Sequence, residues 1–400
     1  QLKEIKKERL TAVSISNRIK NITAGGSDGW GVFNRARKMI SNGEKVIELS
    51  IGEHDIRTDS TIIEAMRKSA LNGNTGYAEM QGLIKLRNLI AKLNEEKTGV
   101  KTRPENVIVT PGGQAGLFAT HMAVCNEGDR ALYLDPYYAT YPGTIRSIGA
   151  KDIPIKTEAK NNFQPTFEEI DKNAHGAKSL LINTPNNPTG AVYTKGTIEG
   201  ISKAVIKHNL WLISDEVYDC QIWNGKHISP RSIKEIEEKT LVIGSMSKSH
   251  AMTGFRCGWV IGPEFIIEHM VNLATSTTYG LPGFIQEAAY FALSQGKEGM
   301  EKVSLPFKRR YELATKILQK NNSINLVPSD GTMYLMVDIR KTGLTGNEFA
   351  NLLLDKKKIA VMPGESFGQA AAGHLRIAMT VSDKIFEQSL IDICELAENL

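Results

Sequence analysis

Short apolar runs alternate with helical spans between about residues 106 and 262 of this 400-residue chain. Continuous apolar runs of this kind are typical of strands buried on both faces, and the spans between them are long enough to form covering helices. The pattern therefore predicts an α/β fold with a mainly parallel sheet flanked by helices. The predicted strands are residues 107–110, 131–134, 151–155, 179–183, 210–215, 241–244 and 257–261.

From about residue 302 the pattern changes to one long helix followed by short strands. The strands are predicted at residues 333–338, 359–361 and 374–379, and further helices at 346–357 and 383–399. This mixed order is typical of an α+β domain, and 400 residues exceed the length of one average domain. We therefore expect a second, smaller domain in the C-terminal part of the chain.

Lys248 follows the strand predicted at residues 241–244 and has unusual neighbours. Ser245 and Ser247 precede it, and Arg256 follows eight positions later. A nearby cation and restricted access to water lower the pKa of an ammonium group, as a lysine that acts as a nucleophile requires. The hydroxyl groups and the guanidinium group can bind an anion such as a cofactor phosphate. An exposed lysine after a strand is the simpler alternative.

Other polar residues also follow the ends of predicted strands. Asp215 ends one strand, Asn187 lies in a loop after another, and Gly113 and Gln114 open a predicted helix that reaches about residue 124. Backbone N–H groups at a glycine-rich helix start can bind phosphate, and parallel sheets bind ligands beyond the carboxyl ends of their strands. Taken singly, the loop is also explained by turn-forming residues and Asp215 by a helix cap.

Together these segments resemble, in the same order, the motifs of the class I and II aminotransferases. These are fold type I enzymes of the aspartate aminotransferase superfamily, which use pyridoxal 5'-phosphate. The lysine motif matches at Lys248, Arg256 and Gly258, with Cys257 in place of the usual aliphatic residue or alanine. The loop at residues 183–190 is similar to the family's Asn-Pro-x-Asn-Pro-Thr-Gly motif.

The resemblance implies a role for each residue near the cofactor ring. Lys248 is expected to carry the cofactor and to move the proton during the reaction, and Asp215 to keep the pyridine nitrogen protonated. Asn187 and Tyr218 are expected to reach the 3'-oxygen of the ring. Tyr138 is expected to stack on the ring, because it lies in a segment that matches the family's aromatic motif, 135–142.

The phosphate of the cofactor is expected to bind a separate group of residues. These are Gly113, Gln114, Ser245, Ser247 and Arg256, joined by Tyr77 from a neighbouring subunit. The expected contact of Tyr77 with a neighbouring subunit implies a homodimer with shared active sites. In the same aromatic segment, residues 137 and 141 are expected to serve in packing.

The α-amino and 2-oxo acid substrates are expected to bind through their carboxylate. Arg376, in the predicted strand 374–379, and Asn187 match residues with this role, and Gly52 is expected to contribute its backbone. Gly52 lies in a turn similar to the family's Gly-Glu-Pro-Asp, where His54 replaces the proline and removes its rigidity.

The resemblance also implies how the chain is divided. Similar enzymes build their smaller domain from both termini, so we expect residues 1–59, with a strand at 46–50, to join residues 302–400. Residues 60–301 are then expected to form the large cofactor-binding domain.

The activity implied is transfer of an amino group from an α-amino acid to a 2-oxo acid by a ping-pong route. The motifs do not separate this from a C–S β-lyase or another pyridoxal reaction on the same fold. A transcription regulator that keeps the cofactor as a ligand is disfavoured, because no DNA-binding segment is visible.

Substrate identity stays open. An acidic substrate needs a second cation for its side-chain carboxylate, and no arginine lies in residues 274–286, which similar enzymes place near the neighbouring active site. Arg35 and Arg37 are candidates for this cation instead. Trp30, Phe33 and Tyr279 are candidates for an apolar side-chain pocket instead.

Composition excludes several classes of function. The 49 basic residues exceed the 44 acidic ones by only five and are scattered, which argues against nucleic acid as a partner. No apolar run approaches the length of a membrane span, and the polar, helix-prone residues 1–9 lack the features of a secretory signal, so we expect a cytoplasmic protein. The absent initiator methionine suggests a trimmed or partial terminus. The four cysteines and eight histidines show no metal-ligand spacing, so we expect no metal site.

Overall fold

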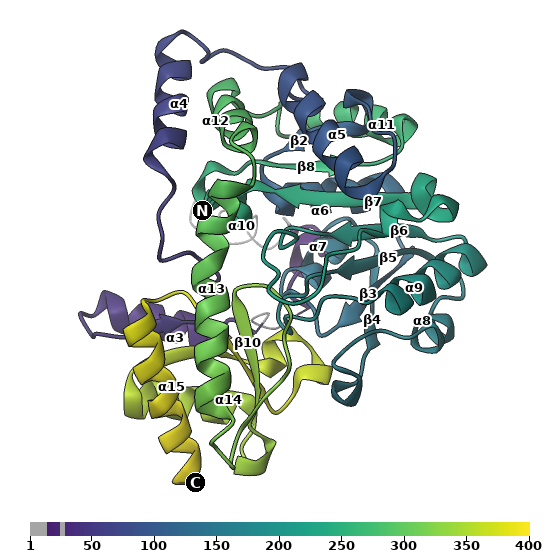
Figure 1. The fold of residues 1–400 in the computed structure, drawn as a ribbon. Coiled ribbons are helices and arrows are strands. Elements are labelled where there is room, and N and C mark those ends of the chain that lie inside the picture. The colour runs from purple at the N-terminus through teal and green to yellow at the C-terminus, as the bar shows by residue number, and fades with distance from the viewer. Residues whose placement is uncertain (1–13, 25–28) are drawn as a thin grey trace, which may run out of the picture.

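The computed structural model describes residues 14–24 and 29–400. The helix-prone residues 1–9, and with them the start of the predicted smaller domain, lie outside the described residues. The strands form two sheets, one of seven strands and one of five, and helices surround both (Figure 1).

The seven-stranded sheet has the order β2-β8-β7-β6-β5-β3-β4. Strands β4, β3, β5, β6 and β7 are joined by parallel pairings, whereas β8 pairs antiparallel with β7 and β2. The predicted mainly parallel sheet is thus confirmed. The strands are β2 (Val107–Thr110), β3 (Arg130–Asp135), β4 (Lys151–Lys156), β5 (Ala177–Asn183), β6 (Trp211–Asp215), β7 (Thr240–Ser245) and β8 (Gly258–Ile261).

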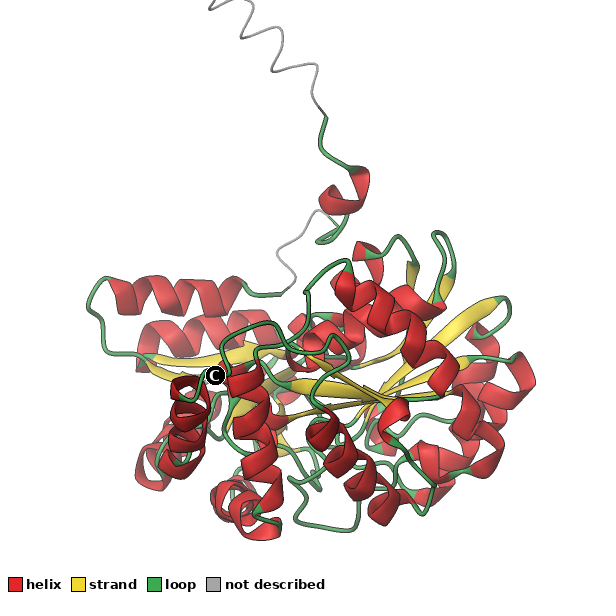
Figure 2. Ribbon diagram, turned by 90° about the horizontal axis from the view of Figure 1, so that it is seen from above, coloured by secondary structure: helices red, strands yellow, loops and turns green. Residues whose placement is uncertain are grey.

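Helices cover both faces of this sheet because successive apolar side chains of each strand point to opposite sides (Figure 2). On β5, Leu181 packs against one face, whereas Leu180 and Ile182 pack against the other. One face is covered by α6 (Gly112–Val124), α7 (Tyr141–Ser147) and α11 (Glu264–Thr275). The other is covered by α5 (Ile84–Thr98), α8 (Phe167–Asn173), α9 (Lys195–His208) and α12 (Gly283–Ser294), and α4 (Ser60–Leu71) packs against α12.

The five-stranded sheet has the order β1-β11-β12-β10-β9. Its β1 comes from the N-terminal part of the chain and pairs in parallel with β11, while the other pairings are antiparallel. The strands are β1 (Ile47–Leu49), β9 (Asn325–Leu326), β10 (Tyr334–Asp338), β11 (Ile359–Pro363) and β12 (His374–Ala378). The accompanying helices are α3 (Gly31–Ser41), α14 (Gly346–Lys357) and α15 (Asp383–Glu398), whereas the short helix α2 (Asn17–Lys20) contacts α7 beside the first sheet.

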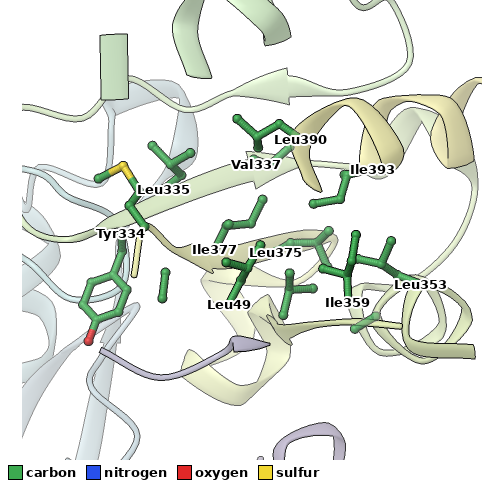
Figure 3. Packing of buried hydrophobic residues seen from close by; sticks show 14 of the residues in the cluster. Leu49, Tyr334, Leu335, Val337, Leu353, Ile359, Leu375, Ile377, Leu390 and Ile393 are labelled. Carbon is green, nitrogen blue, oxygen red and sulfur yellow. The ribbon is translucent and has the colours of Figure 1, made fainter. Parts of the chain in front are cut away.

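A continuous apolar core lies between this second sheet and its helices (Figure 3). Leu335 and Val337 of β10 pack there with Leu390 and Ile393 of α15. The long helix α13 (Lys297–Leu318) contacts α15 and also α10 (Met246–Ser249), which follows β7 of the first sheet. The two sheets are therefore linked by packing as well as by chain connections.

Every strand predicted from the apolar runs is present, with small shifts of its ends. Leu210 lies before β6, and β11 continues to Pro363, two residues beyond the predicted end. The predicted helix at residues 346–357 has the bounds of α14, whereas the two-residue strand β9 has no counterpart among the predictions. The boundaries of the two domains stay a prediction. Within the described residues, no helix is both long enough and apolar enough to cross a bilayer.

Buried histidines give the fold a testable dependence on pH. His121 of α6 is fully buried, and this burial lowers its pKa from 6.5 to about 4. Between these pH values the unfolded chain binds protons that the folded chain excludes, so the free energy of unfolding falls as the pH is lowered. When the pH is lowered from 7.5 to 4.5, we expect the free energy of unfolding to fall by up to about 3 kcal/mol less in the His121→Leu variant than in the wild type. Urea unfolding at the two pH values measures this difference.

The comparison between the two proteins isolates His121 from buried carboxyl groups such as Asp215, whose raised pKa acts in the opposite direction. His175→Leu, at an exposed position, controls for the loss of a histidine. Equal pH dependence in the wild type and in His121→Leu would contradict the prediction.

Candidate active site

A cavity of about 430 Å³ lies beyond the carboxyl ends of the parallel strands of the first sheet, where residues of the second sheet meet it. All but one of the site residues predicted from the sequence line it. They are Gly52, Gly113, Gln114, Tyr138, Asn187, Asp215, Tyr218, Ser245, Ser247, Lys248, Arg256 and Arg376. The other lining residues are Trp30, a candidate for the side-chain pocket, and Ile51, Glu53, Leu117, Tyr141, Asn183, Val217, Thr253, Gly254 and Tyr334.

Lys248 directs its ammonium group into this cavity. Its Nζ donates a hydrogen bond of 2.5 Å to the backbone oxygen of Gly52, in the turn after β1. Burial lowers the pKa of Lys248, and the positive charges of Arg376 and Arg256 lower it further. A larger fraction of neutral amine is therefore available than on an exposed lysine, as a nucleophile or a proton acceptor requires.

The backbone of Lys248 is held by two side chains from other parts of the chain. His54 Nε2 lies 3.0 Å from the Lys248 carbonyl oxygen, and Gln221 Nε2 donates to the same oxygen at 2.9 Å. Burial, and next the charge of Lys248, lower the pKa of His54 to about 4, so at neutral pH its ring is uncharged and Nε2–H is the donor. The residue that replaces the family's proline thus supports the lysine segment and does not line the main cavity.

Asp215 is buried at the end of β6 and receives a hydrogen bond from Tyr141. The Tyr141 hydroxyl donates to Asp215 Oδ2 at 2.6 Å, and the backbone N–H of Val217 donates to Oδ1 at 3.3 Å. Burial raises the pKa of Asp215 to about 6, although both hydrogen bonds oppose this rise. The sequence pattern indicates only packing for Tyr141, whereas the structure shows that it orients the carboxyl group.

Arg376 and Asn187 contact each other in the lining of the cavity. Arg376 Nη1 donates to Asn187 Oδ1 at 2.9 Å, and Nη2 donates to the backbone oxygen of Ser50 at 2.6 Å. The amide nitrogen of Asn187 is thereby left to donate into the cavity. Asn183 fixes this loop, because its Oδ1 accepts a hydrogen bond of 2.8 Å from the backbone N–H of Asn187.

The third nitrogen of Arg376, Nε, is buried and has no hydrogen-bond partner among the described residues. The guanidinium group lies between two aromatic rings, 4.2 Å from the centroid of Tyr334 and 4.4 Å from that of Phe367. A buried cation with an unsatisfied donor favours binding of an anion. This arrangement fits the carboxylate of a substrate.

The start of α6 and the segment around Arg256 also contribute to the lining of the cavity. Gly112 has a φ of +81°, and an added Cβ would overlap the guanidinium group of Arg256. The side-chain amide of Gln114 forms hydrogen bonds with the hydroxyl groups of Thr140 and Thr144, at 2.9 and 2.8 Å. Gln114 would therefore bind an anion through its backbone N–H group at the start of α6. Ser245 Oγ accepts a hydrogen bond of 3.0 Å from the backbone N–H of Ser247.

These residues fit pyridoxal 5'-phosphate. The amine of Lys248, with its lowered pKa, suits the aldehyde of the cofactor, and the buried carboxyl group of Asp215 suits its pyridine nitrogen. Arg256, beside the start of α6, suits its phosphate. The strongest observation is the amine of Lys248, because its place in the cavity and its lowered pKa suit covalent attachment to an aldehyde.

Tyr77 is the predicted residue that does not line the cavity. Its side chain is 88% exposed, and its ring packs edge to face against Tyr279, with the centroids 5.0 Å apart. Because its expected contact is with a neighbouring subunit, its role stays a prediction.

Of the residues considered for substrate specificity, only Trp30 lines the cavity. Phe33 packs beside it in a small apolar cluster. Arg35 forms an ion pair with Asp355 and Arg37 with Glu48, and neither arginine lines the cavity.

Comparisons with known proteins agree with this geometry. The profile of the family described as Aminotransferase class I and II matches residues 44–390. The arginine–pyruvate transaminase of Pseudomonas aeruginosa is 36% identical over 363 residues, 90% of this chain and 92% of that protein. An aspartate aminotransferase of a Bacillus species is 32% identical, over 94% of this chain and 97% of its own length. The crystal structure of an aromatic aminotransferase from Pyrococcus horikoshii matches with a TM-score of 0.86 at 31% identity, over 91% of this chain and 99% of that one.

The hydrogen bond between Tyr141 and Asp215 can be tested through cofactor binding. In Tyr141→Phe the carboxylate loses a donor, so its pKa should rise and its pairing with a protonated pyridine nitrogen should weaken. We expect the affinity for pyridoxal 5'-phosphate, measured by equilibrium dialysis at pH 7.5, to fall about tenfold. Tyr133→Phe is the matched control, because that buried hydroxyl contacts Asp152, outside the cavity. An unchanged affinity in Tyr141→Phe would contradict the prediction.

Proposed function

The chain belongs to the class I and II aminotransferases, pyridoxal-phosphate-dependent enzymes, and we propose that Lys248, Asp215 and Tyr218 carry out its chemistry. Like the family, it transfers an amino group between an α-amino acid and a 2-oxo acid. The observation that carries the residue assignment is Lys248 Nζ, which lies in the cavity with a lowered pKa.

Lys248 is the residue that would hold the cofactor covalently. When bound, pyridoxal 5'-phosphate supplies a reactive aldehyde and a ring that withdraws electrons from the substrate carbon bearing the amino group. In its neutral form, Lys248 Nζ can also take up a proton and return it during the transfer. The carbonyl of Gly52 accepts a hydrogen bond from this nitrogen in its resting position.

Three residues would hold the ring of the cofactor in a reactive state. Asp215 would keep the pyridine nitrogen protonated, and Tyr141 orients its carboxyl group. Asn187 and Tyr218 would donate hydrogen bonds to the 3'-oxygen. This role is supported by the Asn187 amide nitrogen, which Arg376 leaves unoccupied, and by burial of Tyr218, which raises its pKa well above 10 and keeps it protonated.

The remaining residues would bind the cofactor and substrate without taking part in bond changes. Tyr138 would stack on the ring, and the phosphate would be held by Gly113, Gln114, Ser245, Ser247 and Arg256. Arg376 would bind the substrate carboxylate, with Asn187 and the backbone of Gly52 beside it. If each amino donor leaves its amino group on the enzyme before the 2-oxo acid binds, the route is ping-pong.

Separate half-reactions test this function directly. Holoenzyme mixed with an amino donor alone should form a stoichiometric 2-oxo acid and lose the absorbance of its aldehyde cofactor, and addition of a different 2-oxo acid should restore that absorbance. A β-lyase would instead release ammonia continuously without a second substrate. Acidic, aromatic, basic and small aliphatic donors should be compared, because the relatives are named for arginine, aspartate and aromatic substrates.

The role of Arg376 predicts a uniform effect across these donors. Arg376→Lys keeps the charge but loses the paired N–H groups that match a carboxylate. We expect kcat/KM to fall by about 10- to 100-fold for every amino donor and 2-oxo acid, measured in the same half-reactions. Arg35→Lys, whose parent residue pairs with Asp355 outside the cavity, is the matched control. A fall in kcat/KM for the acidic donor alone would show that Arg376 binds the side chain of the substrate and not its α-carboxylate.

We further propose that the enzyme is a cytoplasmic homodimer with shared active sites. The exposed ring of Tyr77, packed on the half-exposed Tyr279 outside the cavity, supports a contact with a second copy. The four cysteines form no disulfide in the described residues, as is usual in a reducing compartment.

A hybrid dimer tests whether Tyr77 acts in the neighbouring site. One chain carries Lys248→Ala and the other Tyr77→Phe, with different tags for purification. If sites are shared, one site of the hybrid keeps both wild-type residues and the hybrid should have about half of the wild-type activity, with wild-type cofactor affinity. Activity no higher than half that of the Tyr77→Phe homodimer would show that Tyr77 acts within its own chain or not at all.

A further inference from the structure

Tyr334 is a buried residue of the cavity that no sequence motif singles out. It begins β10, is only 2% exposed, and belongs to the apolar core of the second sheet. In Figure 3 its ring leaves this core and its hydroxyl group points away from the labelled aliphatic side chains. This hydroxyl lies 3.0 Å from that of Tyr218, and an added Cβ at Gly52 would overlap it.

The ring of Tyr334 has a second contact, with Arg376. The guanidinium carbon lies 4.2 Å from the centroid of this ring and 4.4 Å from that of Phe367, so the two rings enclose the cation. Such contacts restrict a guanidinium group to one plane, and the attraction is stronger where water is excluded. One residue therefore contacts both the proposed 3'-oxygen donor and the proposed carboxylate ligand.

We propose that Tyr334 is a positioning residue with two separable roles. Its hydroxyl group donates to Tyr218 and so directs the Tyr218 proton toward the cofactor's 3'-oxygen, while its ring holds Arg376 in the plane needed to bind a substrate carboxylate. The inference rests on the proposed roles of Tyr218 and Arg376.

The direction of the hydrogen bond follows from the proposed role of Tyr218. At this distance either hydroxyl group can be the donor, and each phenol has a single proton to donate. If Tyr218 donates its proton to the 3'-oxygen, its own oxygen can only accept, so Tyr334 is the donor between the two hydroxyl groups.

The hydroxyl role is tested by Tyr334→Phe, which keeps the ring. Without the donated hydrogen bond, Tyr218 becomes a weaker donor to the negatively charged 3'-oxygen, and the cofactor–lysine linkage becomes more basic. We expect the pKa from the absorbance titration of the holoenzyme to rise by about 0.5 unit, with KM values within about twofold of wild type. Tyr193→Phe, a buried tyrosine outside the cavity, is the matched control.

The ring role is tested by Tyr334→Leu and, on the other side of the guanidinium group, by Phe367→Leu. We expect each to raise KM about tenfold for all amino donors, with a smaller change in kcat. Phe367→Leu should leave the absorbance pKa unchanged, because Phe367 has no hydroxyl group. It also provides an independent measurement if Tyr334→Leu does not fold.

The proposal is overturned if Tyr334→Phe titrates like the wild type, or if Phe367→Leu leaves KM unchanged. These outcomes differ from a failure of the proposed function, in which wild-type holoenzyme would show no lysine-bound absorbance to titrate.

Discussion

The ammonium group of Lys248 is the constraint on which the site depends. It shares a cavity with Arg256 and Arg376 and is largely removed from water, so its environment disfavours the charged form. The hydrogen bond to the Gly52 carbonyl and the two donors to its own carbonyl oxygen hold it in place. Two bound anions, a cofactor phosphate and a substrate carboxylate, would pair with the two arginines.

Both sheets are needed to complete this arrangement. Lys248 follows β7 and Asp215 ends β6, both in the first sheet, whereas Arg376 and Tyr334 belong to the second. The turn after β1 lies between them, and Gly52 permits the close approach of Tyr334 because it has no side chain. A change in the packing of the two sheets would therefore alter the distance between the proposed nucleophile and the substrate ligand.

Much of the site could be predicted from sequence because its residues follow the ends of strands that a parallel sheet brings to one edge. The contacts among side chains could not. The hydroxyl groups of Tyr218 and Tyr334 meet although 116 positions separate the two residues, and the Tyr141 hydroxyl donates to the Asp215 carboxyl group across 74 positions. The apolar neighbours of Tyr334 indicate a core strand, which is correct for its backbone but does not reveal where its hydroxyl group points.

Reductive trapping of the cofactor tests the central claim most directly. Protein saturated with pyridoxal 5'-phosphate is reduced with borohydride and digested, and the modified peptide is identified by mass spectrometry. Lys97 is the internal comparison, because the charges of Asp219 and Glu216 raise its pKa, although desolvation opposes this rise, and keep it charged. The account predicts a pyridoxyl group on Lys248 alone, at one per chain. An adduct on another lysine, or no adduct in saturated protein, would contradict it.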